Sequence, residues 1–252
     1  MYKYLDSHCF FLPPLLYSTV ERLFSQKGFF MHCDGIIFDV DGTLWDSTET
    51  VATAYNAAFA ETGCADVRVT ADSIRHEFGK PMDEIGRDLL PHLPAEDQTR
   101  IMTRCMERED EYLRRYPPVP YPGLEETLDI LRKNHPLFIV SNCQQGYIEL
   151  FLETTGLSDR FADHLCWGDT GLLKADNIRL MAERHKLASP VYVGDIEADC
   201  TAARAAGTAF IWASYGFGTA AHPDAVIRSV RELPSLLNEN TDPERSGAAG
   251  SC

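Results

Sequence analysis

Asp39-Val40-Asp41-Gly42-Thr43-Leu44 directly follows the apolar run Gly35-Ile36-Ile37-Phe38, and these residues decide the interpretation of the chain. The run is typical of a buried strand. Alternate side chains of a strand share a face, so we expect Asp39 and Asp41 to point the same way beyond its carboxyl end. Two carboxylates this close repel each other unless a proton or a cation lies between them. A hard divalent ion such as Mg²⁺, bound through oxygen, meets that need.

Two other interpretations of this stretch compete with a metal site. Asp-Gly-Thr after a strand is often only a solvated turn. A calcium-binding loop is the second alternative, but it requires Asp or Asn at its fifth position and Gly at its sixth, where this chain has Thr43 and Leu44. The calcium loop is therefore excluded, and the rest of the chain decides between a turn and a reaction centre.

Composition limits the classes of function. With 252 residues and 44% hydrophobic content, the chain can bury a substantial core as one large or two smaller domains. The 23 basic and 38 acidic residues give a net charge of −15, which argues against binding to nucleic acid or to an anionic membrane. Any phosphate site in such a chain must depend on a metal and a few well-placed cations.

The eight cysteines form no C-x-x-C pair and no zinc-binding pattern, which predicts a reducing cytoplasmic location. Residues 9–20 superficially resemble a signal peptide, but Pro13 and Pro14 interrupt them and no small-x-small cleavage site follows. No apolar run reaches the roughly 20 residues that span a bilayer. We predict that residues 1–30 are an extension preceding an enzyme fold that begins at Met31, and that residues 238–252 are a disordered tail.

Five short apolar runs are typical of buried parallel strands. They are residues 36–40, 137–140, 164–167, 191–193 and 208–212. Amphipathic helical stretches lie between most of them, at 146–155, 175–185 and 199–206. This alternation predicts an α/β fold with a doubly wound, mainly parallel, Rossmann-like sheet.

A long insertion separates the first two predicted strands, and its sequence is helical throughout. Helices are predicted at residues 48–62, 70–78, 82–90 and 95–116, before a proline-rich return at 117–123. We therefore expect a small all-helical cap at residues 48–119, inserted into a catalytic core made of 31–47 and 120–237.

Polar residues follow four of the predicted strands, at the edge where open α/β sheets bind ligands. They are Asp39 with Asp41, Ser141 with Asn142, Lys174, and Asp195 with Asp199. Alone, each has an ordinary explanation as a helix cap, a solvated lysine or an exposed acid. Their order behind successive strands supplies the groups that phosphoryl transfer needs, because an anionic nucleophile approaches a phosphate only when cations offset the charge.

The order DVDGTL, SN, K and GDIEAD, spread between Cys33 and Leu237, resembles the haloacid dehalogenase superfamily, in its phosphatase branch with a helical cap after the first strand. The resemblance implies that Asp39 is the nucleophile that becomes an aspartyl phosphate. It implies that Asp41 is the general acid and then the general base, and that Thr43 orients Asp41. Ser141 and the Asn142 backbone N–H would hold phosphate oxygens, and Lys174 would offset charge between nucleophile and phosphate.

The same resemblance implies that Mg²⁺ is held by the Asp39 carboxylate, the Asp41 carbonyl oxygen and Asp195. Asp199 would act through water or by supporting a ligand. The chain departs from the family pattern at Trp45, where a small or β-branched residue is common, and at Ile196, where Ser or Thr is common. Trp45 either narrows the entrance beneath the cap, offering a stacking surface, or is simple core packing. Ile196 removes one hydroxyl near the site.

Asp41 favours a phosphatase, because dehalogenases and phosphonatases of this superfamily lack the second acid. The alternative is a phosphosugar mutase of the β-phosphoglucomutase type, which has the same four groups and must keep water from the aspartyl phosphate. The cap loop at residues 76–81 would make that difference, and Lys80 is the candidate substrate contact in the cap. A catalytically idle binding protein is a third possibility. The expected substrate is a small phosphorylated metabolite; phosphoglycolate is the family-level expectation, and sugar phosphates and nucleoside monophosphates stay open.

Overall fold

Six parallel strands form one sheet in the computed structural model, which describes residues 31–238. The strands are β1 (Ile36–Phe38), β2 (Leu137–Ser141), β3 (Asp163–Cys166), β4 (Val191–Gly194), β5 (Ala209–Ala213) and β6 (Ala225–Ile227). Their order is β3-β2-β1-β4-β5-β6, with every pairing parallel. The α/β fold class is confirmed. β6 was not predicted, because it is a three-residue edge strand whose central Val226 is 43% exposed.

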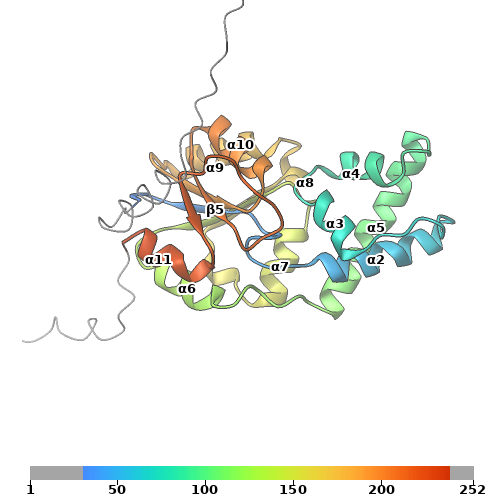
Figure 1. Ribbon diagram of the computed structural model, residues 1–252, viewed down its shortest axis with the longest axis horizontal. Helices are drawn as coiled ribbons and strands as arrows, with labels where there is room; N and C mark the ends of the chain where they lie inside the picture. Colours follow the sequence, from blue (N-terminus) through green and yellow to red (C-terminus); the bar gives the residue numbers. More distant parts are fainter. Residues whose placement is uncertain (1–30, 239–252) are drawn as a thin grey trace, which may run out of the picture.

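Helices cover both faces of the sheet. α9 (Lys174–His185) and α10 (Glu197–Ala206) lie on one face, and α6 (Leu124–Leu131), α7 (Tyr147–Thr155) and α11 (Leu233–Leu236) lie on the other (Figure 1). Alternate strand residues therefore enter separate cores: Ile37 joins one apolar cluster, whereas Ile36 and Phe38 join the second. The helical turns α8 (Trp167–Thr170), η1 (Ser158–Arg160) and η2 (Val230–Glu232) complete the connections.

Four helices between β1 and α6 gather at one side of the sheet, and we call them the cap (Figure 1). They are α2 (Thr48–Glu61), α3 (Ala71–Glu77), α4 (Met82–Leu89) and α5 (Ala95–Arg115). The start of α3 is fixed by a capping box, in which Thr70 and Ser73 each accept the other's backbone N–H. The helices agree closely with the expected ranges, and the division into a cap at 48–119 and a two-part core stays a prediction.

The turn after β1 and the turn after β4 lie side by side, because β1 and β4 are neighbours although half of the chain separates them. The Asp39 N–H donates to the Val193 carbonyl at 2.9 Å. Gly42 has φ +78°, and a Cβ there would lie 2.1 Å from Asp195 Oδ2. Only glycine therefore permits this approach. The sheet order reverses at this position, which is where open α/β folds bind ligands.

The described part of the chain has no helix both long and apolar enough to cross a membrane. Within the described residues, the cysteines at positions 64, 105, 143, 166 and 200 are free thiols. The cytoplasmic location stays a prediction. The expectations for residues 1–30 and 239–252 fall outside the described residues.

Candidate active site

A buried lysine joins two buried acids at the centre of the sheet's carboxyl edge. Lys174 begins α9 and is 4% exposed, and its Nζ lies 3.0 Å from Asp39 Oδ1 and 2.6 Å from Asp199 Oδ1. Burial lowers the pKa of Lys174, but the charges of Asp199 and Asp39 outweigh burial and raise it above its usual value. The ammonium is therefore a fixed positive charge beside Asp39, the residue that the family resemblance predicts to be the nucleophile.

Three acids come close enough to surround one ion. Ligand oxygens of Asp39, Asp195 and Asp199 lie within 4.8 Å of one another. Burial first, and then the neighbouring acids, raise the pKa of Asp195 to about 8, and burial raises that of Asp39 to about 6 against the opposing effect of Lys174. One lysine does not balance three carboxylates, so the cluster lacks positive charge.

The donor set fits a hard divalent cation. Asp39 Oδ1 is buried and, apart from its ion pair with Lys174, has no hydrogen-bond partner within the described residues. Asp195 uses one oxygen to accept the Phe217 N–H at 2.7 Å, which leaves its other oxygen for an ion. Both Asp199 oxygens are engaged, because Oδ1 meets Lys174 and Oδ2 accepts the N–H groups of Asp195 and Ile196 at 3.0 and 3.2 Å. This geometry favours Asp199 as a support and not as a direct ligand.

Asp41 is held by side chains that the sequence did not indicate. Its Oδ1 accepts hydrogen bonds from Trp45 Nε1 at 3.0 Å, Ser47 Oγ at 2.6 Å and the Tyr147 hydroxyl at 2.8 Å. Burial raises the pKa of Asp41 to about 7, even though the bonds from Ser47 and Tyr147 oppose that shift. A carboxyl with such a pKa can both donate and accept a proton near neutral pH.

The role expected of Thr43 is corrected by these contacts. Its hydroxyl is buried and makes no hydrogen bond to any described residue, so Trp45, Ser47 and Tyr147 orient Asp41 in its place. Trp45 is fully buried and packs edge-on against Tyr147 and Phe151, with ring centroids 6.1 and 4.9 Å away. The indole is therefore core packing that also contacts the acid, and it offers no stacking surface at an entrance.

The cap meets the core at Ser141 and Asn142, the second pair of polar residues predicted to follow a strand. Ser141 ends β2, and the next residue, Asn142, donates its side-chain N–H to the Gly79 carbonyl of the cap at 2.7 Å. Ile196, which replaces the expected hydroxyl residue, faces the same loop, since a Cβ at position 79 would lie 2.5 Å from Ile196 Cδ1. The loop at residues 78–81, between α3 and α4, is thus the seam between cap and core.

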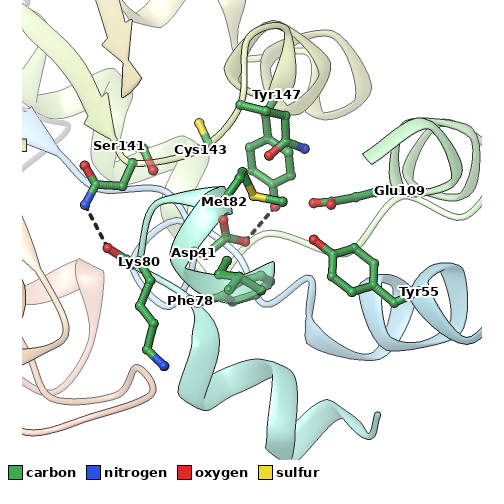
Figure 2. Close-up of a pocket in the computed structure, with 13 residues that line it drawn as sticks. Asp41, Tyr55, Phe78, Lys80, Met82, Glu109, Ser141, Cys143 and Tyr147 are labelled. Carbon is green, nitrogen blue, oxygen red and sulfur yellow. Dashed lines mark hydrogen bonds between the residues drawn. The ribbon is translucent and has the colours of Figure 1, made fainter. Parts of the chain in front are cut away.

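Lys80 lines the cavity beneath the cap, but its ammonium is directed away from Asp41 (Figure 2). It pairs with Asp88 at 2.7 Å and Glu77 at 2.9 Å. The cavity has about 30 Å³ of free volume and is narrow where the cap loop meets the core.

Sequence reasoning also missed Glu109, a cap residue that lines this cavity and is 3% exposed. Burial, followed by the charge of Asp41, raises the pKa of Glu109 to about 8. A usable indication existed. Ile101, Cys105 and Leu113 form the buried stripe of α5 at four-residue spacing, and Glu109 occupies the remaining position of that stripe.

Comparison with known proteins agrees with this geometry. The model of the haloacid dehalogenase-like hydrolase family matches residues 36–213. A phosphoglycolate phosphatase of Photobacterium profundum is 30% identical, over 80% of this chain and 94% of its own length. One from Shigella boydii is 27% identical, over 81% of this chain and 92% of its own length. The solved structure of a protein described as a putative haloacid dehalogenase-like hydrolase, from Bacteroides fragilis, is also similar. It has a TM-score of 0.71 and 25% identity, and the match covers 79% of this chain and 99% of that protein's chain.

Proposed function

We propose that this chain, which belongs to the haloacid dehalogenase-like hydrolase family, is a Mg²⁺-dependent phosphatase. It would hydrolyse a small phosphomonoester through an aspartyl phosphate. The observation that carries the proposal is the Lys174 ammonium fixed 3.0 Å from Asp39, within a cluster of three acids that needs a cation. Relatives named phosphoglycolate phosphatase, similar over most of their length, support the same class of reaction.

The first half-reaction would use Asp39 and Asp41 in different roles. A carboxylate oxygen of Asp39 attacks phosphorus, and the bond between phosphorus and the ester oxygen breaks. Asp41 gives its proton to the departing alcohol oxygen, which its pKa of about 7 allows. Lys174, Ser141 and the Asn142 N–H would hold the charged phosphoryl oxygens.

The second half-reaction would restore the enzyme. Asp41, now a carboxylate, takes a proton from water as that water attacks phosphorus, and the bond to Asp39 breaks to release inorganic phosphate. Mg²⁺ would be held by Asp39, the Asp41 carbonyl oxygen and Asp195. When bound, it supplies positive charge that offsets the phosphate and the carboxylates.

Phosphate release from p-nitrophenyl phosphate and from a panel of small phosphate esters tests this proposal. We expect turnover that requires Mg²⁺, stops with EDTA, and falls at least 1,000-fold in Asp39→Asn, because the nucleophile is lost. Asp72→Asn is the matched control, since that cap side chain is 79% exposed. No turnover of any ester in the presence of Mg²⁺ would refute the proposal and support an idle binding protein. Turnover that needs a bisphosphate activator would indicate a mutase.

A further inference from the structure

Glu109 points into the active-site cavity from the opposite wall to the phosphate-binding turn. It comes from α5, and its carboxyl group faces the Tyr55 hydroxyl of α2 near Asp41 (Figure 2). The acids in the neighbouring turns of α5, such as Glu107 and Glu111, instead pair with arginines on the solvent side. Glu109 is therefore placed to meet whatever group is attached to the phosphate, and not the phosphate itself.

Three polar atoms that line this cavity are buried and make no well-formed hydrogen bond among residues 31–238, although Tyr55 and Gln144 lie close enough to Glu109 to lower the pKa of its carboxyl group. They are Glu109 Oε2, Gln144 Nε2 and Asn142 Oδ1. Leaving buried polar atoms unpaired costs free energy, and such atoms in a native structure call for an explanation. A ligand with hydroxyl groups can supply both the donors and the acceptors that these atoms lack.

The cavity offers no free cation to an acidic leaving group. Among the residues that line it, Lys80 is the single cation, and its two ion pairs with Asp88 and Glu77 already engage it. Asp41 and Glu109 are both acids. A carboxylate on the alcohol side of the substrate would lie near these acids without a free cation to pair with, and buried charges need a partner.

From these contacts we infer that Glu109 and Gln144 form a leaving-group subsite for an uncharged, hydroxyl-bearing alcohol. The inference rests on the proposed phosphatase function and narrows it. The preferred substrate is a phosphate ester of a polyol, and phosphoglycolate, which carries a second anion, is disfavoured. The preferred substrate would then differ from phosphoglycolate, the substrate in the name of its relatives.

Two esters of equal length that differ in charge test the inference. With the Mg²⁺-loaded enzyme, kcat/KM for 2-hydroxyethyl phosphate should exceed that for phosphoglycolate at least tenfold. An equal or higher value for phosphoglycolate, with p-nitrophenyl phosphate still hydrolysed, would overturn the subsite and leave the proposed function standing. A clear preference for 2-aminoethyl phosphate over both would also overturn it, because the subsite would then bind a cation. Inactivity towards all four esters would count against the proposed function itself.

Substitutions at the subsite distinguish a loss of substrate binding from a general loss of folded enzyme. Glu109→Leu and Gln144→Leu should each reduce kcat/KM for 2-hydroxyethyl phosphate about tenfold, mainly through KM, because each removes a polar contact to the alcohol. Glu109→Gln keeps a polar group and should retain most of that activity. Glu107→Gln, on the solvent side of the same helix, is the matched control and should change nothing. Wild-type KM values in both leucine variants would refute the subsite.

Discussion

Replacing Lys174 by methionine tests how the acidic cluster is held together. The change removes a buried positive charge, 3.0 Å from Asp39 and 2.6 Å from Asp199, while keeping much of the side chain's length. Removing one partner of a buried ion pair costs about 3–5 kcal/mol of unfolding free energy, because the remaining charge stays buried. For a domain of this size, that loss corresponds to a fall in Tm of roughly 6–20 °C.

The size of this loss should depend on pH. The pKa of Asp39 is already raised to about 6 with Lys174 present, and it must rise further without it. A carboxyl group with a higher pKa in the folded state than in the unfolded state binds more protons when folded. Stability therefore declines as pH rises from the unfolded pKa through the folded pKa. Lys174→Met should accordingly lose less stability at pH 5 than at pH 8.

Urea unfolding followed by circular dichroism, in the presence of EDTA, measures both effects. Lys133→Met is the control, because Lys133 is exposed. Adding Asp199→Asn to Lys174→Met should recover part of the loss, since one uncompensated charge disappears while the amide oxygen still accepts the N–H groups of Asp195 and Ile196. The reasoning fails if Lys174→Met lies within about 0.5 kcal/mol of wild type at pH 8, or if its deficit is the same at both pH values.

Three further predictions concern the general acid, the seam and the buried carboxyls. Tyr147→Phe removes one of the three donors to Asp41, so the pKa of this general acid should rise and the alkaline limb of the pH profile of kcat/KM should move up by about one unit; an unmoved limb would contradict this role. Gly79→Ala should lower the free energy of unfolding in urea by about 1–2 kcal/mol, because φ at this position is +88° and the new methyl would clash with Ile196. Adding Ile196→Ala should recover the part of the loss that is due to this clash. In EDTA, the raised pKa values of Asp41 and Glu109 mean that the folded state binds extra protons, so Tm should be lower at pH 8.5 than at pH 5.5; a higher Tm at pH 8.5 would refute those pKa values.

The position of several expected site residues follows directly from the order of the strands, although their roles stay predictions. Asp39, Ser141 and Asp195 each stand at or just beyond the end of an apolar run, and parallel strands bring such ends to one edge whatever the helices do. Lys174 begins α9, the second helical segment after β3, so its approach to Asp39 also follows from the order of elements. For these residues, local pattern and topology are sufficient.

Contacts that depend on packing between distant segments could not be predicted in this way. Tyr147 lies 106 positions from Asp41, and the two meet only because α7 packs beneath the turn after β1. The family resemblance assigned Thr43 to Asp41, yet its buried hydroxyl has no hydrogen-bond partner among the described residues. Glu109 was overlooked because α5 contains many acids, and only its place in the apolar stripe distinguishes it from the solvent-facing ones.

The three-donor contact around Asp41 joins the cap to the chemistry. Ser47, which donates to Asp41, immediately precedes α2, the first helix of the cap, whereas Tyr147 belongs to the core. The direction in which α2 leaves the core therefore affects one of the three hydrogen bonds that align the acid. Proton transfer by Asp41 would then depend on the position of the cap. A large phosphate ester that prevents the cap from closing would then meet a poorly aligned general acid, and its hydrolysis would be slow.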